Sequence, residues 1–193
     1  MTRTRLMHLL RRATVLSGGQ RLILAGSQAF YAVAPAAPEL VERSEEANLL
    51  LVGVERSLFQ RLNEALGMES PYLLETGVFA HPVGPGTITL VAGWEERLVA
   101  FGREEGLANV WALEIHDLAA SKLMAGRDKD FEFLRALLEH GLCDFSTLLT
   151  RFEALRASAY ANAVPDRLTK LAAHLRAWRR EDLARTVHPH PSS

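Results

Sequence analysis

The sequence predicts an α/β (α+β) protein, with a small mixed sheet flanked by helices and then a helical subdomain. Short, continuously apolar segments alternate with segments of helical periodicity through residues 1–114, and this pattern is typical of strands covered by helices. From residue 115 onward the apolar patterns are helical. Hydrophobic residues make up 48% and charged residues 23% of the 193 residues, which is enough apolar side chain for a packed core.

The first half predicts helices and strands in alternation. "LMHLLRRATVL" has leucines at helical spacing and predicts a helix that ends at Gly18. "RLILA" predicts a short strand, followed by a corner at Gly26 and Ser27 and a helix over "SQAFYAVA". "EANLLLVGV" predicts a strand apolar enough to be buried on both faces, and "ERSLFQRLNEALG" predicts a helix with one leucine stripe.

The second half predicts a few strands and then only helices. "GVFAHPV" and "TITLV" predict strands around the turn at Gly84–Gly86, and "NVWALEI" predicts another. Helices are expected at Asp117–Ala125, Asp128–His140, Phe145–Ala157 and Asp166–Arg185. We expect three parts: an α/β core over residues 1–114, a helical subdomain over 115–187 packed on that core, and a disordered tail over 188–193.

Charge and cysteine content narrow the function classes only slightly. The net charge is −1, but residues 1–21 hold five arginines and no acid, residues 39–75 hold eight glutamates against three arginines, and residues 146–186 are again basic. This layout fits either an acidic site flanked by polyanion-binding surfaces or ordinary solvated helix faces. A single cysteine, Cys143, excludes an internal disulfide and favours a buried apolar role. No segment predicts a signal peptide or a membrane span, so we expect a cytoplasmic protein with no membrane partner.

The corner at Gly26 and Ser27 has two interpretations. A glycine lets a phosphate approach the backbone closely, and a serine at a helix start adds a hydroxyl donor. The same two residues also make an ordinary turn and N-cap. The corner alone therefore does not predict a binding site.

Two polar residues on the next strand could bind a cation. Glu46 and Asn48 are two residues apart, so they project from one face of the strand, whereas Ala47 and Leu49 face the other way. Carboxylate and amide oxygens suit a hard cation such as Mg²⁺. The alternative is the solvated start of a strand.

A lysine interrupts an apolar helix stripe in "EIHDLAASKLMAGRDKDFEFLRALL". Lys122 falls within the stripe that Leu118 and Leu123 help to form, and Asp130 lies at the edge of the following stripe. Burying an unpaired ammonium group is costly, so Lys122 must pair with a carboxylate or face a polar cavity. A pair with Asp130, Asp117 or Glu114 would tie two helices together.

Together these segments resemble a known family. "GSQAF", "SEEANLLL", "AGWEERLVAF" and "LEIHDLAASKLMAGRDKDFEFLRALL" are similar to bacterial nucleotidyltransferase-fold domains of unknown function, which are related to AbiEii-type toxins. The resemblance runs from about residue 9 to residue 155, and the "HDLAASKL…RDKD" block is its most specific part.

The resemblance implies roles for individual residues. Gly26 and Ser27 match the pair that grips the terminal phosphates of a nucleotide, and Glu46 matches the first acid of the metal-binding pair. Lys122 matches a lysine directed at phosphate, and Arg127 and Asp130 match the polar pair that follows it. The catalytic residues implied are thus Lys122, Asp130 and Glu46, with an NTP as substrate or ligand and Mg²⁺ on Glu46 and Asn48.

One departure from the family pattern weakens the metal site. Asn48 stands where the family usually has a second acid, and it supplies an oxygen ligand without negative charge. Glu75 and Glu114 are guesses for a third acid.

Three functions follow as hypotheses. In the first, the chain is an enzyme that moves a nucleotide from an NTP to a tRNA end or a protein side chain. In the second, it is a catalytically degraded module that binds nucleotide, RNA or protein. In the third, it is an assembly partner, such as an antitoxin paired with its toxin, that uses Trp178 and the last helix as an interface.

Overall fold

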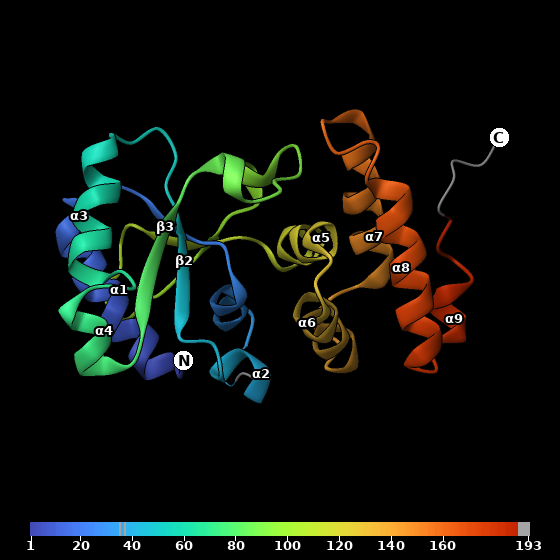
Figure 1. Ribbon diagram of the computed structural model, residues 1–193, viewed down its shortest axis with the longest axis horizontal. Coiled ribbons are helices and arrows are strands. Elements are labelled where there is room, and N and C mark those ends of the chain that lie inside the picture. The colour runs from blue at the N-terminus through green and yellow to red at the C-terminus, as the bar shows by residue number, and fades with distance from the viewer. Residues whose placement is uncertain (35, 37, 189–193) are drawn as a thin grey trace. The chain divides into compact units, whose positions relative to one another are not determined.

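A computed structural model describes residues 1–34, 36 and 38–188 of the chain (Figure 1). The described residues divide into two compact units. Unit 1 comprises Met1–Ile88 and Glu95–Glu114, and unit 2 comprises Thr89–Trp94 and the chain from Ile115 onward. The disordered tail expected over 188–193 lies, apart from His188, outside the described residues. Within the described ranges, no helix combines the length and the apolar character that crossing a bilayer requires.

Unit 1 contains a mixed five-stranded sheet. Its strands, in the order β3-β2-β1-β5-β4, are β3 (Phe79–Val83), β2 (Glu46–Leu50), β1 (Leu22–Leu24), β5 (Val110–Ala112) and β4 (Val99–Ala100). β1 is antiparallel to β2 and parallel to β5, and β2 is parallel to β3. The mixed sheet with flanking helices confirms the α/β (α+β) class.

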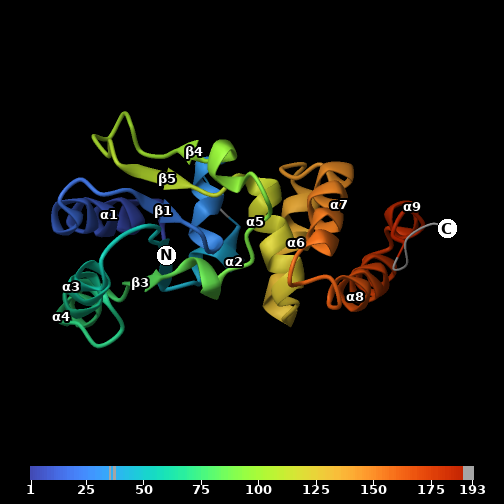
Figure 2. The ribbon, with the colours of Figure 1, turned by 90° about the horizontal axis from the view of Figure 1, so that it is seen from above.

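Three helices cover one face of this sheet. They are α1 (Arg3–Ser17), α3 (Arg56–Leu66) and α4 (Pro71–Thr76), which lie side by side in Figures 1 and 2. The predicted leucine stripe of α3 is confirmed, since Leu58, Leu62 and Leu66 are all buried. The remaining elements of this part of the chain are short: η1 (Ser27–Ala32), α2 (Glu39–Glu42), η2 (Pro85–Thr87) and η3 (Trp94–Arg97).

Unit 2 is helical, as the sequence predicts. Its elements are α5 (Ile115–Ala125), α6 (Asp128–Glu139), α7 (Phe145–Glu153), η4 (Ala154–Ala157), α8 (Val164–Ala177) and α9 (Glu181–Ala184). α5 packs against α6, α7 and α8, and its residues Leu118, Ala119 and Leu123 are fully buried. Cys143 is buried, as expected for a small apolar residue.

One predicted element is wrong, and two differ from the structure in type or extent. The helix expected over "SQAFYAVA" forms as a 3-10 helix of six residues, in which the Gln28 side chain donates to the Val41 carbonyl. No strand forms over "TITLV": Thr87 is the last residue of η2, and residues 88–91 pair with no strand of the sheet. The last helix is interrupted after Ala177.

The interruption has a backbone cause. Arg179 adopts a left-handed conformation with φ of 60°. The Arg180 amide donates to the Leu175 carbonyl and the Arg179 amide to the Arg176 carbonyl, which is the hydrogen-bond pattern of a Schellman end. A second short helix, α9, then begins at Glu181.

Candidate functional site at the Gly26 corner

The Gly26 corner follows the end of β1. All three residues of β1 are buried, and the Ala25 amide donates to the Asn48 carbonyl at 3.1 Å, which continues the pairing with β2. Gly26 is buried and Ser27, the first residue of η1, is half-buried. The corner is therefore held on the sheet by backbone hydrogen bonds, with Ser27 at its surface.

Glu46 and Asn48 lie beside this corner. The antiparallel register pairs Leu24 with Leu49, so the start of β2 meets the end of β1. Glu46 and Asn48 are half-buried and alternate with the fully buried Ala47 and Leu49, which confirms that they share a strand face.

Asn48 also explains why residue 26 is a glycine. A methyl group at Gly26 would overlap the Asn48 amide nitrogen and approach its Cβ to 3.1 Å. The φ of Gly26 is −104°, so the glycine is needed for space rather than for backbone conformation. The close contact holds the Asn48 side chain over the corner.

The structure adds His81, which the sequence analysis missed. β3 pairs with β2 so that His81 lies opposite Asn48, and His81 Nδ1 is 2.6 Å from Glu46 Oε1. The side chains of His81 and Glu46 are 50% and 35% exposed, so the pair is open to solvent. Its only signal in the sequence is a histidine within an apolar strand. The residues guessed as a third acid, Glu75 and Glu114, lie on α4 and at the end of unit 1.

The donors at the corner fit one divalent cation and not two. Among the described residues, no group of three His, Cys, Asp or Glu side chains is placed to hold a metal ion. Glu46 supplies one carboxylate, with the Asn48 amide and the His81 imidazole beside it. Mg²⁺ is commonly held by one or two carboxylates plus substrate phosphates, so Glu46 is the minimum for one ion. An imidazole donor suits Mn²⁺ better than Mg²⁺.

Lys122, Arg127 and Asp130 form a separate cluster in unit 2. The Lys122 ammonium lies 3.1 Å from Asp130 Oδ1, which joins α5 to α6. Arg127 donates to both carboxylate oxygens of Asp130, at 2.6 and 3.1 Å. This is the ion pair between two helices that the sequence analysis left open, and it accounts for the inward position of Lys122.

Burial and neighbouring charges have opposite effects on the pKa values of Lys122 and Asp130. Burial lowers the pKa of Lys122, and the charge and hydrogen bond of Asp130 counteract part of that change. Burial by itself would raise the pKa of Asp130, but the hydrogen bond from Arg127 and the charge of Lys122 outweigh it and hold that pKa below its ordinary value. Asp130 is thus a fully buried carboxylate between two cations.

The predicted site residues therefore belong to two groups. Gly26, Ser27, Glu46 and Asn48 come together in unit 1, and Lys122, Arg127 and Asp130 come together in unit 2. That the two groups act on one nucleotide stays a prediction.

Comparison with known proteins supplies the family context. Residues 4–180 match the model of the family DUF6036, described as a nucleotidyltransferase of unknown function. Comparisons with curated proteins and with solved structures found no match.

Proposed function

Because the chain belongs to the DUF6036 family of nucleotidyltransferases of unknown function, we propose that it binds an NTP at the Gly26 corner and transfers its nucleotidyl group to an acceptor. The observation that carries the proposal is the convergence of Glu46, Asn48 and His81, from two strands, beside Gly26 and Ser27. Packing alone does not require three polar side chains on one face of an otherwise apolar strand pair.

The proposed reaction is an in-line displacement at phosphorus. An acceptor oxygen bonds to the α-phosphorus of the NTP, the bond from that phosphorus to the bridging oxygen breaks, pyrophosphate leaves, and the acceptor proton passes to water. The Ser27 hydroxyl, half-buried at the corner, donates to a phosphate oxygen. Glu46 would hold one divalent cation, which when bound neutralises charge on the phosphates. Positioning and charge neutralisation are the main catalytic terms for this chemistry.

We also propose that the cluster in unit 2 binds phosphate. Asp130 orients Lys122 and Arg127, whose side chains remain 17% and 58% exposed. Both cations therefore have an edge open to solvent while their position is fixed by a buried carboxylate. Such a pair suits a phosphate chain, because charge-assisted hydrogen bonds are stronger than neutral ones.

A second candidate function is binding without transfer. Asn48 replaces a potential carboxylate, and His81 lies against the one carboxylate that remains. A site with so little negative charge holds a divalent cation weakly. On this alternative the chain is a degraded nucleotidyltransferase that binds nucleotide or RNA.

The proposal also covers the acceptor and the biological role. We propose a tRNA end or a protein side chain as acceptor, a relationship to AbiEii-type toxins, and a cytoplasmic toxin–antitoxin or defence role with a cognate partner. The motif resemblance between residues 9 and 155 supports these roles.

One assay separates the two candidates. The native chain is incubated with each α-labelled NTP, Mg²⁺ or Mn²⁺, and total tRNA or a protein mixture, and incorporated label is measured. Glu46→Gln should abolish incorporation, whereas Glu45→Gln, which removes an exposed carboxylate one residue away, should not.

The outcomes divide as follows. Incorporation by the native chain supports transfer. Incorporation by Asn48→Asp alone supports binding without transfer in the native chain. If no variant incorporates label and no NTP binds in calorimetry, the nucleotide proposal is wrong.

A further inference from the structure

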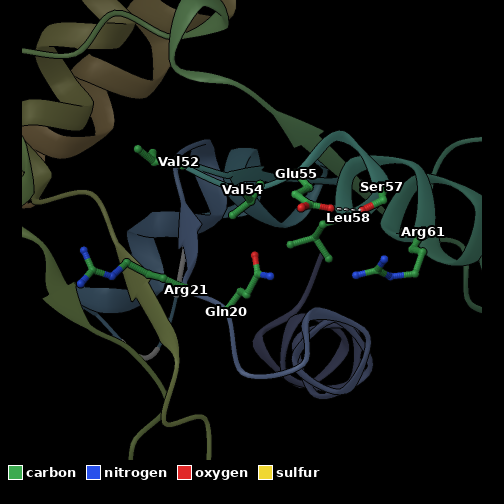
Figure 3. A pocket seen from close by; sticks show the side chains of 9 residues that line it. Gln20, Arg21, Val52, Val54, Glu55, Ser57, Leu58 and Arg61 are labelled. Atoms are coloured by element: carbon green, nitrogen blue, oxygen red, sulfur yellow. Dashed lines mark hydrogen bonds between the residues drawn. The ribbon is translucent and has the colours of Figure 1, made fainter.

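Two surface hollows lie along α3 in unit 1. One, of about 570 Å³, lies between α1 and the end of α3 and is lined by Arg11, Arg12, Val15 and Leu66 among others. The other, of about 450 Å³, lies at the start of α3 around Leu58 and Arg61 (Figure 3). Leu58, Arg61 and Ala65 lie at helical spacing on one side of α3, and they line one or the other hollow. We call the two hollows together the α3 groove.

The α3 groove is positively charged. Among the described residues that line the first hollow there are two arginines and His8, and no carboxylate. In the second hollow the Arg61 guanidinium points toward Gln20, and the carboxylate present, Glu55, accepts a hydrogen bond from Ser57 at 3.4 Å. An occupant with negative charge is therefore favoured at both ends.

One apolar side chain of the groove is strongly exposed. Val15 lines the first hollow and is 80% exposed. Val15 therefore offers an apolar contact to an occupant of this hollow, beside the positive charge of Arg11 and Arg12.

The shape and chemistry favour a protein helix as the occupant. Among the described residues that line the two hollows there is no Phe, Tyr or Trp, and the His8 ring is already stacked on Tyr72, so the groove lacks the large stacking platforms that single-stranded nucleic acid uses. α3 has 11 residues, so the groove runs for roughly 16 Å at 1.5 Å per residue, the length of three helical turns.

We propose that the α3 groove binds an acidic amphipathic helix of a partner protein. Leucine-like side chains of that helix enter the hollows beside Val15 and Leu58, and its carboxylates pair with Arg11, Arg12 and Arg61. This surface is separate from the Gly26 corner in its residues, and the proposal does not depend on nucleotide binding.

A peptide selection tests the proposal. The full chain is used to select from a displayed library of 18-residue helical peptides that have leucines at positions i, i+4, i+7 and i+11. The other positions vary among Glu, Lys, Ser and Ala. We expect the selected peptides to be acidic and to bind with micromolar affinity that weakens as salt rises.

Variants locate the binding. Arg11→Glu/Arg12→Glu and, separately, Val15→Asp should each weaken the selected peptides at least tenfold. Arg5→Glu, an equally exposed position on α1 that lines neither hollow, should leave binding unchanged. Val15 is 80% exposed, so its substitution should not affect folding, which circular dichroism checks.

Four results would overturn the proposal. The library yields no binder; the selected peptides are basic or neutral; the Arg11→Glu/Arg12→Glu variant binds them as tightly as the native chain does; or a 20-nucleotide RNA displaces them from the native chain at lower concentration than unlabelled peptide.

Discussion

Replacing Asp130 separates a structural role of the unit 2 cluster from a functional one. Asp130→Asn keeps the shape of the side chain but removes the charge of the carboxylate. That carboxylate lies 3.1 Å from the Lys122 ammonium and accepts two hydrogen bonds from the Arg127 guanidinium. Removing one partner of a buried ion pair generally costs about 3–5 kcal/mol. Arg127 is 58% exposed and can turn to water, and Lys122 keeps 17% exposure, so we expect the low end, about 3 kcal/mol.

Lys122→Met provides the contrast. It leaves Asp130 hydrogen-bonded to Arg127 and replaces the ammonium with an apolar group of similar length, so we expect a loss of about 1 kcal/mol or less. If Lys122 contacts phosphate, however, NTP affinity should fall at least tenfold in this variant. An assay of stability alone would not detect this loss of NTP affinity.

The assay is urea unfolding at pH 7, followed by the fluorescence of the three tryptophans, with NTP binding measured by calorimetry. The reasoning is refuted if Lys122→Met destabilises the chain as much as Asp130→Asn does. The phosphate role alone is refuted if Lys122→Met binds NTP as the native chain does.

The same cluster predicts a pH dependence. The pKa of Asp130 in the folded chain is below its ordinary value of 3.8, so its contribution to stability is present above that value and is lost as the pH falls through the lower, folded pKa. In the Asp130→Asn variant, the unfolding free energy should therefore decrease less steeply than in the native chain as the pH falls below about 4. An unchanged acid limb in the variant would contradict this assignment.

Three further predictions concern the Gly26 corner. Gly26→Ala should destabilise the chain by about 1–3 kcal/mol, because its methyl group would overlap the Asn48 amide, and adding Asn48→Ala should restore most of that loss in thermal unfolding. Asn48→Asp should tighten divalent cation binding at least tenfold in calorimetry, because it adds a second carboxylate beside Glu46. The native chain should prefer Mn²⁺ to Mg²⁺, and His81→Asp should reduce that preference. Equal affinity for both ions in the native chain would exclude His81 as a ligand.

Local periodicity predicted the long helices and the face of β2. The stripe of α3, the alternation of Glu46 and Asn48 with buried residues, and the inward Lys122 all depend on neighbours within one element. Such patterns can be read from the sequence because the period of an element is fixed by its backbone geometry.

Contacts between distant segments could not be predicted in this way. His81 reaches Glu46 only because β3 pairs in parallel with β2 in one particular register, across a connection that contains α3 and α4. A shift of one residue would turn His81 to the other face. Likewise, the strand expected over "TITLV" has suitable residue types but finds no partner in the sheet, and β propensity without a partner does not make a strand.

The pairing of Glu46 with His81 has a consequence for stability without metal. Three carboxylates at positions 46, 48 and 81 would repel one another unless a cation lay between them. In the native chain, by contrast, His81 and Glu46 form a hydrogen bond and the uncharged Asn48 side chain packs on Gly26. The native corner should therefore fold without metal, and removing a weakly bound cation with EDTA should lower its melting temperature only slightly.

Asn48→Asp/His81→Asp should reverse this behaviour. The double variant places two further carboxylates beside Glu46, so in EDTA it should melt below the native chain. Adding Mg²⁺ at about 100 times its dissociation constant should then raise the unfolding free energy by about 2.7 kcal/mol. If the variant instead melts like the native chain in EDTA and ignores Mg²⁺, then positions 46, 48 and 81 do not share one cation site. Sodium chloride at equal ionic strength is the control, because screening alone would relieve part of the repulsion among such exposed carboxylates.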